Sequence, residues 1–217
     1  RRAADFNLAI RKIIYDREED LCAGERLIIA KNNYYWTRPS VVDATSGNIN
    51  GESESRRPMD FIANGDSCVV EKVFSTETHA ISTFADVRLY FPDLDWRVDA
   101  KLNLDTLRSD TSGLPNEKRE WLYRQALRDA GVGEDASPTA IRKVLKADPF
   151  YNALQVKFGY AVTCHKAQGG QWPSVFVDMG YIPPEAYSTV DFFRWLYTAV
   201  TRANRRLTLI NPSVKIV

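Results

Sequence analysis

Two polar segments near the end of the sequence carry side chains suited to binding a phosphate-containing ligand. The first reads TCHKAQGGQW, begins at Thr163 and directly follows the apolar run 156–162. Ligands of parallel α/β sheets bind where strands end and polar turns begin. Thr163 is expected to cap the helix that follows, and the free backbone N–H groups behind it suit a phosphate. An ordinary strand-to-helix turn has the same residue types, so both interpretations stay open on physical grounds.

Further residues of this segment could contact a ligand directly. Gln168 and Gln171 supply neutral hydrogen-bonding groups. Gly169 and Gly170 would let the backbone approach a ligand closely, because they have no side chain.

The second segment, residues 192–206, reads FFRWLYTAVTRANRR. Its spacing predicts a helix over 190–205 with an apolar stripe and a polar face. The stripe contains Phe192, Leu196, Ala199 and Ala203, and the opposite side carries Arg194, Thr198, Thr201 and Arg205, flanked by Arg202. A solvated basic face and an arginine that binds phosphate are the two available interpretations.

Strands and helices alternate around these segments. Beyond Pro149 the pattern predicts strands at 156–162, 175–179 and 207–210, with helices at 165–168 and 190–205. Such alternation indicates a parallel sheet covered by helices.

The earlier part of the sequence has a different pattern of predicted secondary structure. An amphipathic helix is predicted from the spacing of Phe6, Ile10, Ile13 and Ile14, followed by a strand at 26–30 and a polar loop at 37–58. Asn64-Gly65 is a turn signal, and the strand-like runs 68–74 and 80–91 are connected by 75–78. Helical spacing returns over 116–146. We expect a small antiparallel β module with added helices, inserted into the α/β domain.

Composition narrows the class of protein. The 217 residues are 44% hydrophobic, and 29 Lys and Arg nearly balance 28 Asp and Glu, so net charge alone predicts no polyanionic partner. Three widely separated cysteines and two histidines form no metal-binding pattern, which predicts no metal site and favours a reducing cytoplasm. No apolar run approaches the roughly 20 residues of a membrane span, so no membrane partner is expected.

Both polar segments resemble motifs of superfamily 1 (UvrD/RecD-like) DNA helicases. Residues 163–169, TCHKAQG, are similar to motif V, T-x-H-K-S-Q-G, with Ala167 in place of serine. Gln171 stands where many relatives carry a glutamate that contacts ribose. Residues 196–203, LYTAVTRA, are similar to motif VI, whose final arginine corresponds to Arg202. Looser similarities relate residues 1–7 to motif IV and residues 24–66 to the start of an inserted SH3-like β domain.

The resemblance implies a fold and a division of the chain. The expected fold class is α/β, a second RecA-like domain of the P-loop NTPase type. Residues 1–36 and 151–217 would form this domain, and 37–150 would be the inserted SH3-like module with its helical elaboration. The phosphate loop, G-x-x-x-x-G-K-[S/T], and the paired acids that hold magnesium do not occur in the sequence. In this family they belong to the N-terminal RecA-like domain, which is therefore an expected partner.

The resemblance also implies an activity and roles for residues. The chain would be the C-terminal half of an ATP-dependent DNA helicase, with ATP and Mg²⁺ bound mainly by the other domain. Arg202 would be the catalytic arginine finger, and Gln168, Gly169, Gln171 and Arg202 would contact ATP. Thr163, His165 and Thr198 would contact single-stranded DNA. Two alternatives stay open: the helicase subunit of an exodeoxyribonuclease complex, with further exonuclease subunits as partners, and a non-catalytic nucleic-acid-binding module.

Overall fold

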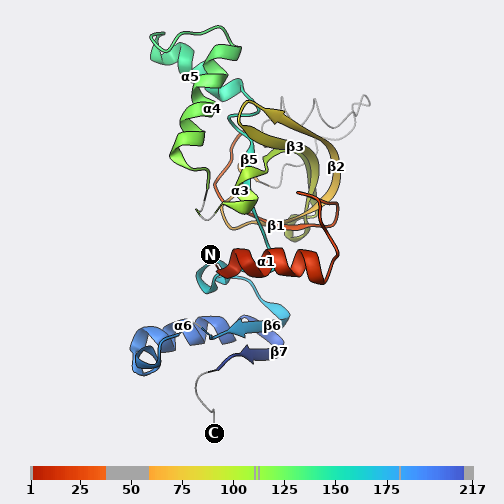
Figure 1. Ribbon diagram of the computed structural model, residues 1–217, viewed down its shortest axis with the longest axis vertical. Coiled ribbons are helices and arrows are strands. Elements are labelled where there is room, and N and C mark those ends of the chain that lie inside the picture. The colour runs from red at the N-terminus through yellow and green to blue at the C-terminus, as the bar shows by residue number, and fades with distance from the viewer. Residues whose placement is uncertain (1, 38–58, 110, 112, 181, 213–217) are drawn as a thin grey trace. The chain divides into compact units, whose positions relative to one another are not determined.

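The computed structural model describes residues 2–37, 59–109, 111, 113–180 and 182–212. The loop predicted at 37–58 falls, apart from Thr37, outside the described residues. The chain divides into two compact units, Arg1–Ala161 and Val162–Val217 (Figure 1).

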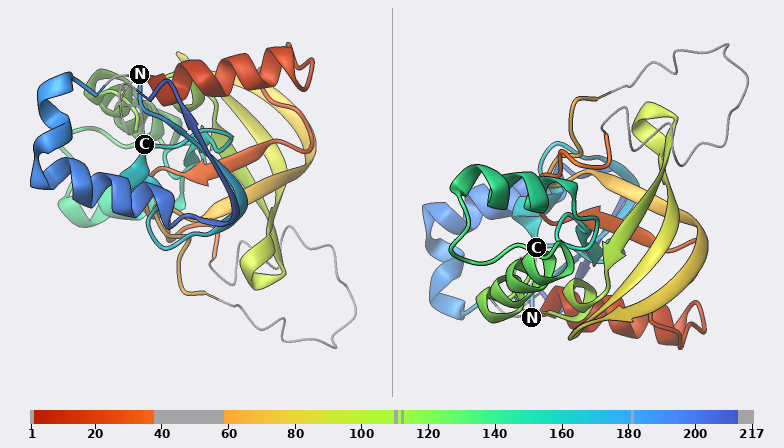
Figure 2. Two further views of the ribbon diagram at one scale, coloured as in Figure 1. Left: turned by 90° about the horizontal axis from the view of Figure 1, so that it is seen from below. Right: turned by 90° about the horizontal axis from the view of Figure 1, so that it is seen from above.

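A closed five-stranded barrel forms the centre of the first unit. Its strands are β1 (Arg26–Ile29), β2 (Ser67–His79), β3 (Ser82–Phe91), β4 (Trp96–Asn103) and β5 (Leu154–Phe158). Neighbouring strands pair antiparallel except β4 and β5, which are parallel, and β1 closes the barrel by pairing with both β2 and β5. The strands curve around a common interior in Figure 2. The small β module predicted from the sequence is therefore present as a barrel.

Alternation along the strands fills the barrel interior with apolar side chains. In β3, Val87, Leu89 and Phe91 are buried, whereas Arg88 and Tyr90 between them are partly exposed. This period of two places one face of the strand in the core and the other toward solvent. The same core includes residues of every barrel strand, among them Leu27, Val70, Val98 and Val156.

The β2–β3 hairpin differs from the prediction at its connection. Residues 75–78, predicted as the link, continue β2, and the chain turns at Ala80 and Ile81 instead. Ala80 takes a left-handed conformation with φ of 62°. Thr76 and Thr78 are β-branched and fit a strand, so the pairing of β2 with β3 outweighs the polar composition of the segment. The predicted turn at Asn64-Gly65 is confirmed, with φ of 103° at Gly65.

The predicted N-terminal helix is confirmed as α1 (Arg2–Ile13), but its apolar spacing does not describe what it buries. Ile13 is 79% exposed, whereas Asn7 and Arg11 are the buried residues of the helix. The prediction of an apolar buried face is wrong here, because the helix instead buries polar side chains that find partners inside the first unit.

The described part of the first unit also contains a short 3₁₀ helix, η1 (Pro92–Leu94), and three further α-helices. They are α3 (Asp105–Arg108), α4 (Asn116–Asp129) and α5 (Pro138–Ala147), and the last two coincide with the predicted helical stretch 116–146 to within one residue. Ser137 caps α5 by accepting a hydrogen bond from the backbone N–H of Ala140. Phe84, Leu122 and Ala153 are buried together, so α4 packs against the outside of the barrel.

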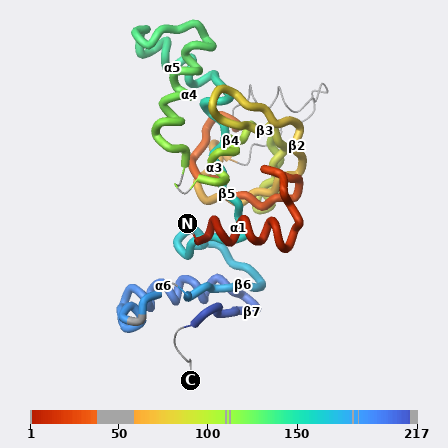
Figure 3. Tube along the Cα trace, viewed as in Figure 1, coloured from red at the N-terminus to blue at the C-terminus, as the bar shows by residue number. Residues whose placement is uncertain are grey.

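The second unit contains a strand–helix–strand arrangement. Its elements are the short 3₁₀ helix η2 (Cys164–Ala167), β6 (Trp172–Asp178), a second 3₁₀ helix η3 (Pro184–Ser188), α6 (Val190–Val200) and β7 (Ala203–Ile210). β6 and β7 pair in parallel, and Val177, Met179 and Ala199 are buried between the sheet and α6. Figure 3 traces this path from β6 through α6 to β7.

Two boundaries in this region correct the sequence-based predictions. The strand predicted at 156–162 is β5 and ends at Phe158. The helix predicted to reach Arg205 ends at Val200. From Ala203 the chain pairs with β6 instead, so sheet formation overrides the helical spacing and leaves Arg202 in the connecting turn.

The described residues therefore form a mixed α/β structure with a small β-barrel and a two-stranded parallel sheet. Two strands expected in the α/β domain, β1 and β5, belong to the barrel. Among the described residues, no helix is long and apolar enough to cross a bilayer.

Candidate functional site

The turn that follows Thr163 is tighter than the sequence suggests. Thr163 precedes η2, but its side chain makes no capping hydrogen bond. Its backbone carbonyl accepts hydrogen bonds from the N–H groups of Lys166 and Ala167 instead, at 2.9 and 3.1 Å. The predicted side-chain cap is therefore wrong. Because the backbone N–H groups of Lys166, Ala167 and Gln168 are used inside the turn, fewer free groups are left to bind phosphate than expected.

The structure favours glycine at positions 169 and 170 for different reasons. Gly169 has φ of 87°, and a side chain built there would meet open space. A Cβ at Gly170 would clash with the Trp172 ring. The close approach at Gly170 is thus to the protein's own tryptophan, whereas Gly169 leaves its surroundings open to a ligand.

Arg202 connects the turn to the end of α6. Its Nη1 donates a hydrogen bond to the carbonyl of Gly170 at 2.9 Å, and its Nε donates to the carbonyl of Thr198 at 3.0 Å. Its Nη2 donates to the hydroxyl of Thr201 at 3.0 Å. The Arg202 carbonyl in turn accepts a hydrogen bond from the backbone N–H of Trp172 at 2.8 Å. The residue is fixed through both its side chain and its backbone.

A second contact joins the same two segments. Gln171 Nε2 lies 3.4 Å from the carbonyl of Thr201, to which it donates a long hydrogen bond. Among the ATP-binding residues suggested by the sequence, Gln171 and Arg202 are therefore brought together. Gln168 and Gly169 lie in the same turn and are exposed.

The three candidate DNA-binding residues have different surroundings. Thr163 and His165 are exposed at the start of the turn. Thr198 is partly buried on α6, where its hydroxyl donates to the carbonyl of Arg194 at 2.9 Å. Thr198 can accept a hydrogen bond from a ligand without change, but it can donate one only by giving up this contact.

Cys164 and Thr201 help to hold the candidate site together, and the motif comparison assigns neither of them a role. Cys164 Sγ lies 3.6 Å from the carbonyl of Trp195 and so connects η2 to α6. Burial raises the pKa of the Cys164 thiol, although the nearby Arg202 charge opposes this shift, so the thiol stays a neutral donor. Thr201 supplies the acceptor for Arg202 Nη2. Their residue types give no signal of these contacts, because both depend on where α6 ends.

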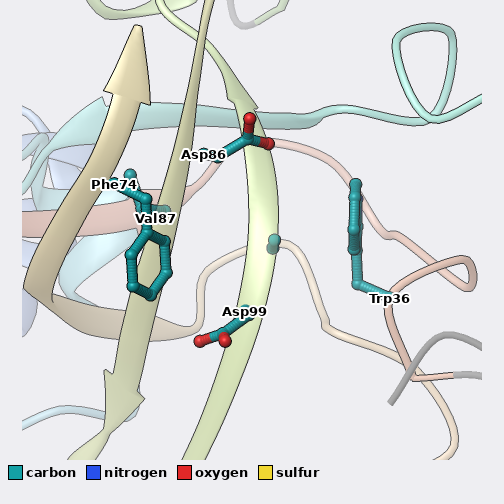
Figure 4. Close-up of a pocket in the computed structure, with 6 residues that line it drawn as sticks. Trp36, Phe74, Asp86, Val87 and Asp99 are labelled. Atoms are coloured by element: carbon teal, nitrogen blue, oxygen red, sulfur yellow. The ribbon is translucent and has the colours of Figure 1, made fainter. Parts of the chain in front are cut away.

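A separate cavity of about 310 Å³ lies on the barrel. Figure 4 shows Asp86 and Asp99 at its lining, together with Trp36, Phe74 and Val87. Both carboxylates are already paired, Asp86 with Lys101 at 2.8 Å and Asp99 with Arg88 at 2.7 Å. None of the site residues proposed from the sequence lines this cavity.

Possible metal ligands are dispersed over the described part of the chain. No three His, Cys, Asp or Glu side chains gather there in an arrangement that could hold a metal ion.

A family comparison covers both polar segments. Residues 158–210 match the model of the UvrD-like helicase C-terminal domain. This range contains Thr163, Arg202 and all the contacts that join the turn to α6. No curated protein matches the chain. The match over residues 158–210 identifies a helicase-related segment and supports the assignment of the chain to the C-terminal portion of a UvrD/RecD-like superfamily 1 helicase.

Proposed function

We propose that the chain is the C-terminal half of an ATP-dependent DNA helicase, which translocates on single-stranded DNA and unwinds duplex DNA. Its second unit would belong to the second RecA-like domain. The barrel would be the inserted SH3-like module. In this proposal Arg202 is the catalytic arginine finger, and the turn 163–171 contacts both DNA and nucleotide.

The hydrogen bond between Arg202 and Gly170 is the observation that carries this proposal. It joins the arginine of the motif VI similarity to the backbone directly after the motif V similarity, at 2.9 Å. A guanidinium group has five N–H donors, and three of them are used in the contacts to Thr198, Gly170 and Thr201. Two N–H groups remain to bind phosphate oxygens, which is sufficient for a bidentate contact.

The residues of the turn fit one wall of a nucleotide site. Gln168 and Gly169 are exposed beside the segment that Arg202 contacts, and Gly169 leaves space for close approach. When bound, ATP and Mg²⁺ would supply the phosphoryl group and its charge neutralisation. Arg202 would stabilise the charge that develops on the transferred phosphoryl group. The remaining contacts would come from the N-terminal RecA-like domain of the full-length protein.

The DNA contacts would be directed at the phosphate backbone. Thr163 and His165 are exposed and carry hydrogen-bonding side chains at the start of the turn. Thr198 on α6 would donate its hydroxyl to a phosphate oxygen in exchange for its present hydrogen bond to the Arg194 carbonyl. Contacts of this kind fix the strand without reading its sequence.

Two other candidate functions predict different behaviour. A RecD-like subunit of an exodeoxyribonuclease complex would share the helicase activity but act together with nuclease subunits. A non-catalytic nucleic-acid-binding module would bind DNA without using Arg202 for hydrolysis. The fixed position of Arg202 beside the turn favours the catalytic alternatives.

The test is to purify the full-length protein that contains this chain and to measure ATP hydrolysis with and without single-stranded DNA. Unwinding of a partial duplex is measured in parallel. The proposal expects DNA-stimulated hydrolysis and strand separation that both depend on ATP. DNA binding without hydrolysis would support the non-catalytic module and contradict the proposal. Copurification with a nuclease subunit would favour the exodeoxyribonuclease alternative.

A further inference from the structure

A cluster of buried and partly buried polar side chains in the first unit holds the stretch of chain that leads into the turn at Thr163. Its members come from α1, from the segment before β1 and from the residues that follow β5. They are Asn7, Arg11, Arg17, Glu25 and Tyr160. Motifs V and VI do not include these residues, although Asn7 ends the looser similarity to motif IV and the segment that matches the helicase model begins at Phe158.

Asn7 binds both backbone groups of Ala161. Its Nδ2 donates to the Ala161 carbonyl at 2.9 Å, and its Oδ1 accepts from the Ala161 N–H at 2.8 Å. Asn7 is 6% exposed, so water competes little for these two hydrogen bonds. Ala161 is the last residue of the first unit, and Thr163 follows two positions later.

Glu25 holds the neighbouring residue, Tyr160. The fully buried Glu25 carboxylate accepts hydrogen bonds from Arg11 Nε at 2.8 Å and from the Tyr160 hydroxyl at 2.6 Å. Arg17 Nη1 lies 3.2 Å from the same carboxylate. Burial and the hydrogen bond to Glu25 raise the pKa of Tyr160 to about 12, so its hydroxyl remains a donor at neutral pH.

The cluster continues to the end of β5. The Arg11 guanidinium lies 4.3 Å from the centre of the Phe158 ring, a cation–π distance. Arg11 and Asn7 are four residues apart and therefore lie on the same face of α1. This face contacts Phe158 and Ala161, while Tyr160 is held from the Glu25 side.

Packing α1 against the barrel does not require a polar cluster of this kind. A buried charge needs several partners to offset its loss of hydration, and apolar residues could pack the same helix more simply. The bidentate contact of Asn7 fixes a backbone position and not merely a surface. The Ala161 N–H and carbonyl belong to the peptide planes before and after Ala161, so the contact fixes the direction in which the chain leaves the first unit.

We infer that Asn7, assisted by the Glu25–Tyr160 pair, is a positioning residue that sets the start of the turn at Thr163 and thereby couples DNA binding to ATP hydrolysis. This inference rests on the proposed function. In this role Asn7 touches neither ligand. It acts through the backbone of Ala161, and its loss affects stimulation of hydrolysis by DNA more than hydrolysis itself.

The test uses Asn7→Ala in the full-length protein. We expect basal ATP hydrolysis to stay within about twofold of the wild type, because the Arg202 contacts are intact. The maximal rate with saturating single-stranded DNA should fall about tenfold, the scale of a modest misplacement of a binding group. Tyr160→Phe, which removes only the hydroxyl, should also lower the maximal DNA-stimulated rate, but by a smaller factor. Tyr15→Phe is its matched control, since Tyr15 is exposed and its ring packs against that of Tyr160.

Two controls separate positioning from loss of stability. Lys12→Ala changes an exposed residue of α1 and should leave stimulation unchanged. Val87→Ala destabilises the barrel core away from the cluster and should lower the melting temperature without lowering stimulation. Hydrogen exchange provides a readout that does not depend on activity: the Ala161 amide should exchange faster in Asn7→Ala than in either control.

The outcomes distinguish the inference from the proposed function. If the wild type shows no DNA stimulation, the proposed function fails, and the inference fails with it. If the wild type is stimulated and Asn7→Ala is stimulated equally, the inference alone is overturned. A loss of stimulation in Val87→Ala of the same size would also overturn it, because general destabilisation would then be sufficient.

Discussion

The guanidinium group of Arg202 and the backbone carbonyl of Gly170 are joined by a hydrogen bond of 2.9 Å. The two residues lie on separate polar segments, and the bond makes those segments one structural unit. A change in the turn can therefore reach Arg202 directly, and a change at Arg202 can alter the turn. This relationship determines how variants at either position should be interpreted.

Arg202→Ala in the full-length protein is expected to reduce ATP turnover by roughly 10³-fold, the effect associated with loss of an arginine finger. Arg202→Lys should recover little of this loss, because an ammonium group cannot reproduce the planar, bidentate contacts. Steady-state hydrolysis with saturating ATP measures both variants. Nucleotide affinity, measured separately, should change far less.

Arg205→Ala is the matched control for Arg202. Arg205 is an exposed arginine on β7, three positions after Arg202. Its loss should leave ATP turnover within about twofold of the wild type. A change below about tenfold in Arg202→Ala would assign Arg202 a purely structural role in holding the turn.

The purified 217-residue chain should hydrolyse no ATP, with or without single-stranded DNA. The sequence contains no phosphate-loop pattern, so contacts to the β- and γ-phosphates would have to come from another domain. Phosphate release by the isolated chain, compared with the full-length protein under the same conditions, measures this. DNA-stimulated turnover by the isolated chain would contradict the proposed division of the ATP site.

Alkaline pH should destabilise the first unit through Cys68. Burial raises the pKa of this thiol from 9.0 to about 12. Below about pH 9 both folded and unfolded states keep the proton, but between about pH 9 and 12 mainly the unfolded state loses it, so stability falls as pH rises. Cys68→Ala removes this contribution.

Urea unfolding at about pH 8 and about pH 10.5 measures the effect of Cys68. The wild type should lose about 1–2 kcal/mol more than Cys68→Ala between these two values. Tyr160 shifts in the same direction in both proteins, so it cancels in the comparison. Equal losses would show that the Cys68 thiol is accessible to solvent in the folded state.

Local patterns predicted much of the fold. The spacing of apolar residues and the turn residues predicted helix α1, the turn at Gly65 and strands that form the barrel. The buried face of α1 could not be predicted in this way. Hydrophobic periodicity assigns Ile13 to the interior, but Asn7 and Arg11 find hydrogen-bonding partners more than a dozen positions away in the chain. Such partners are invisible to a local pattern.

The contacts within the candidate site could not be predicted from the local sequence either. Residue types and motif similarity identify Thr163, Gln168 and Arg202, but not which groups they contact. The end of α6 at Val200 decides that Arg202 lies in a turn, and it depends on pairing between β6 and β7. The hydrogen bonds of Arg202 to Gly170 and Thr198 follow from that pairing and not from the local sequence.

Replacing both Thr163 and His165 by alanine should weaken single-strand binding and lower the stimulation of ATP hydrolysis by DNA, while basal hydrolysis survives. Both side chains are exposed at the start of the turn whose later residues, Gln168 and Gly169, are the candidate nucleotide contacts. Ser174→Ala, which removes an exposed hydroxyl outside the turn, is the matched control. Backbone-directed contacts carry no sequence information, so the loss of affinity should be similar for all single-stranded sequences and should depend on salt. Fluorescence anisotropy with several oligonucleotides at two salt concentrations, together with stimulated ATPase rates, measures each part. Normal affinity and normal stimulation in the double variant would leave Thr163 and His165 with no part in DNA binding, and a loss confined to one oligonucleotide would indicate contacts to bases.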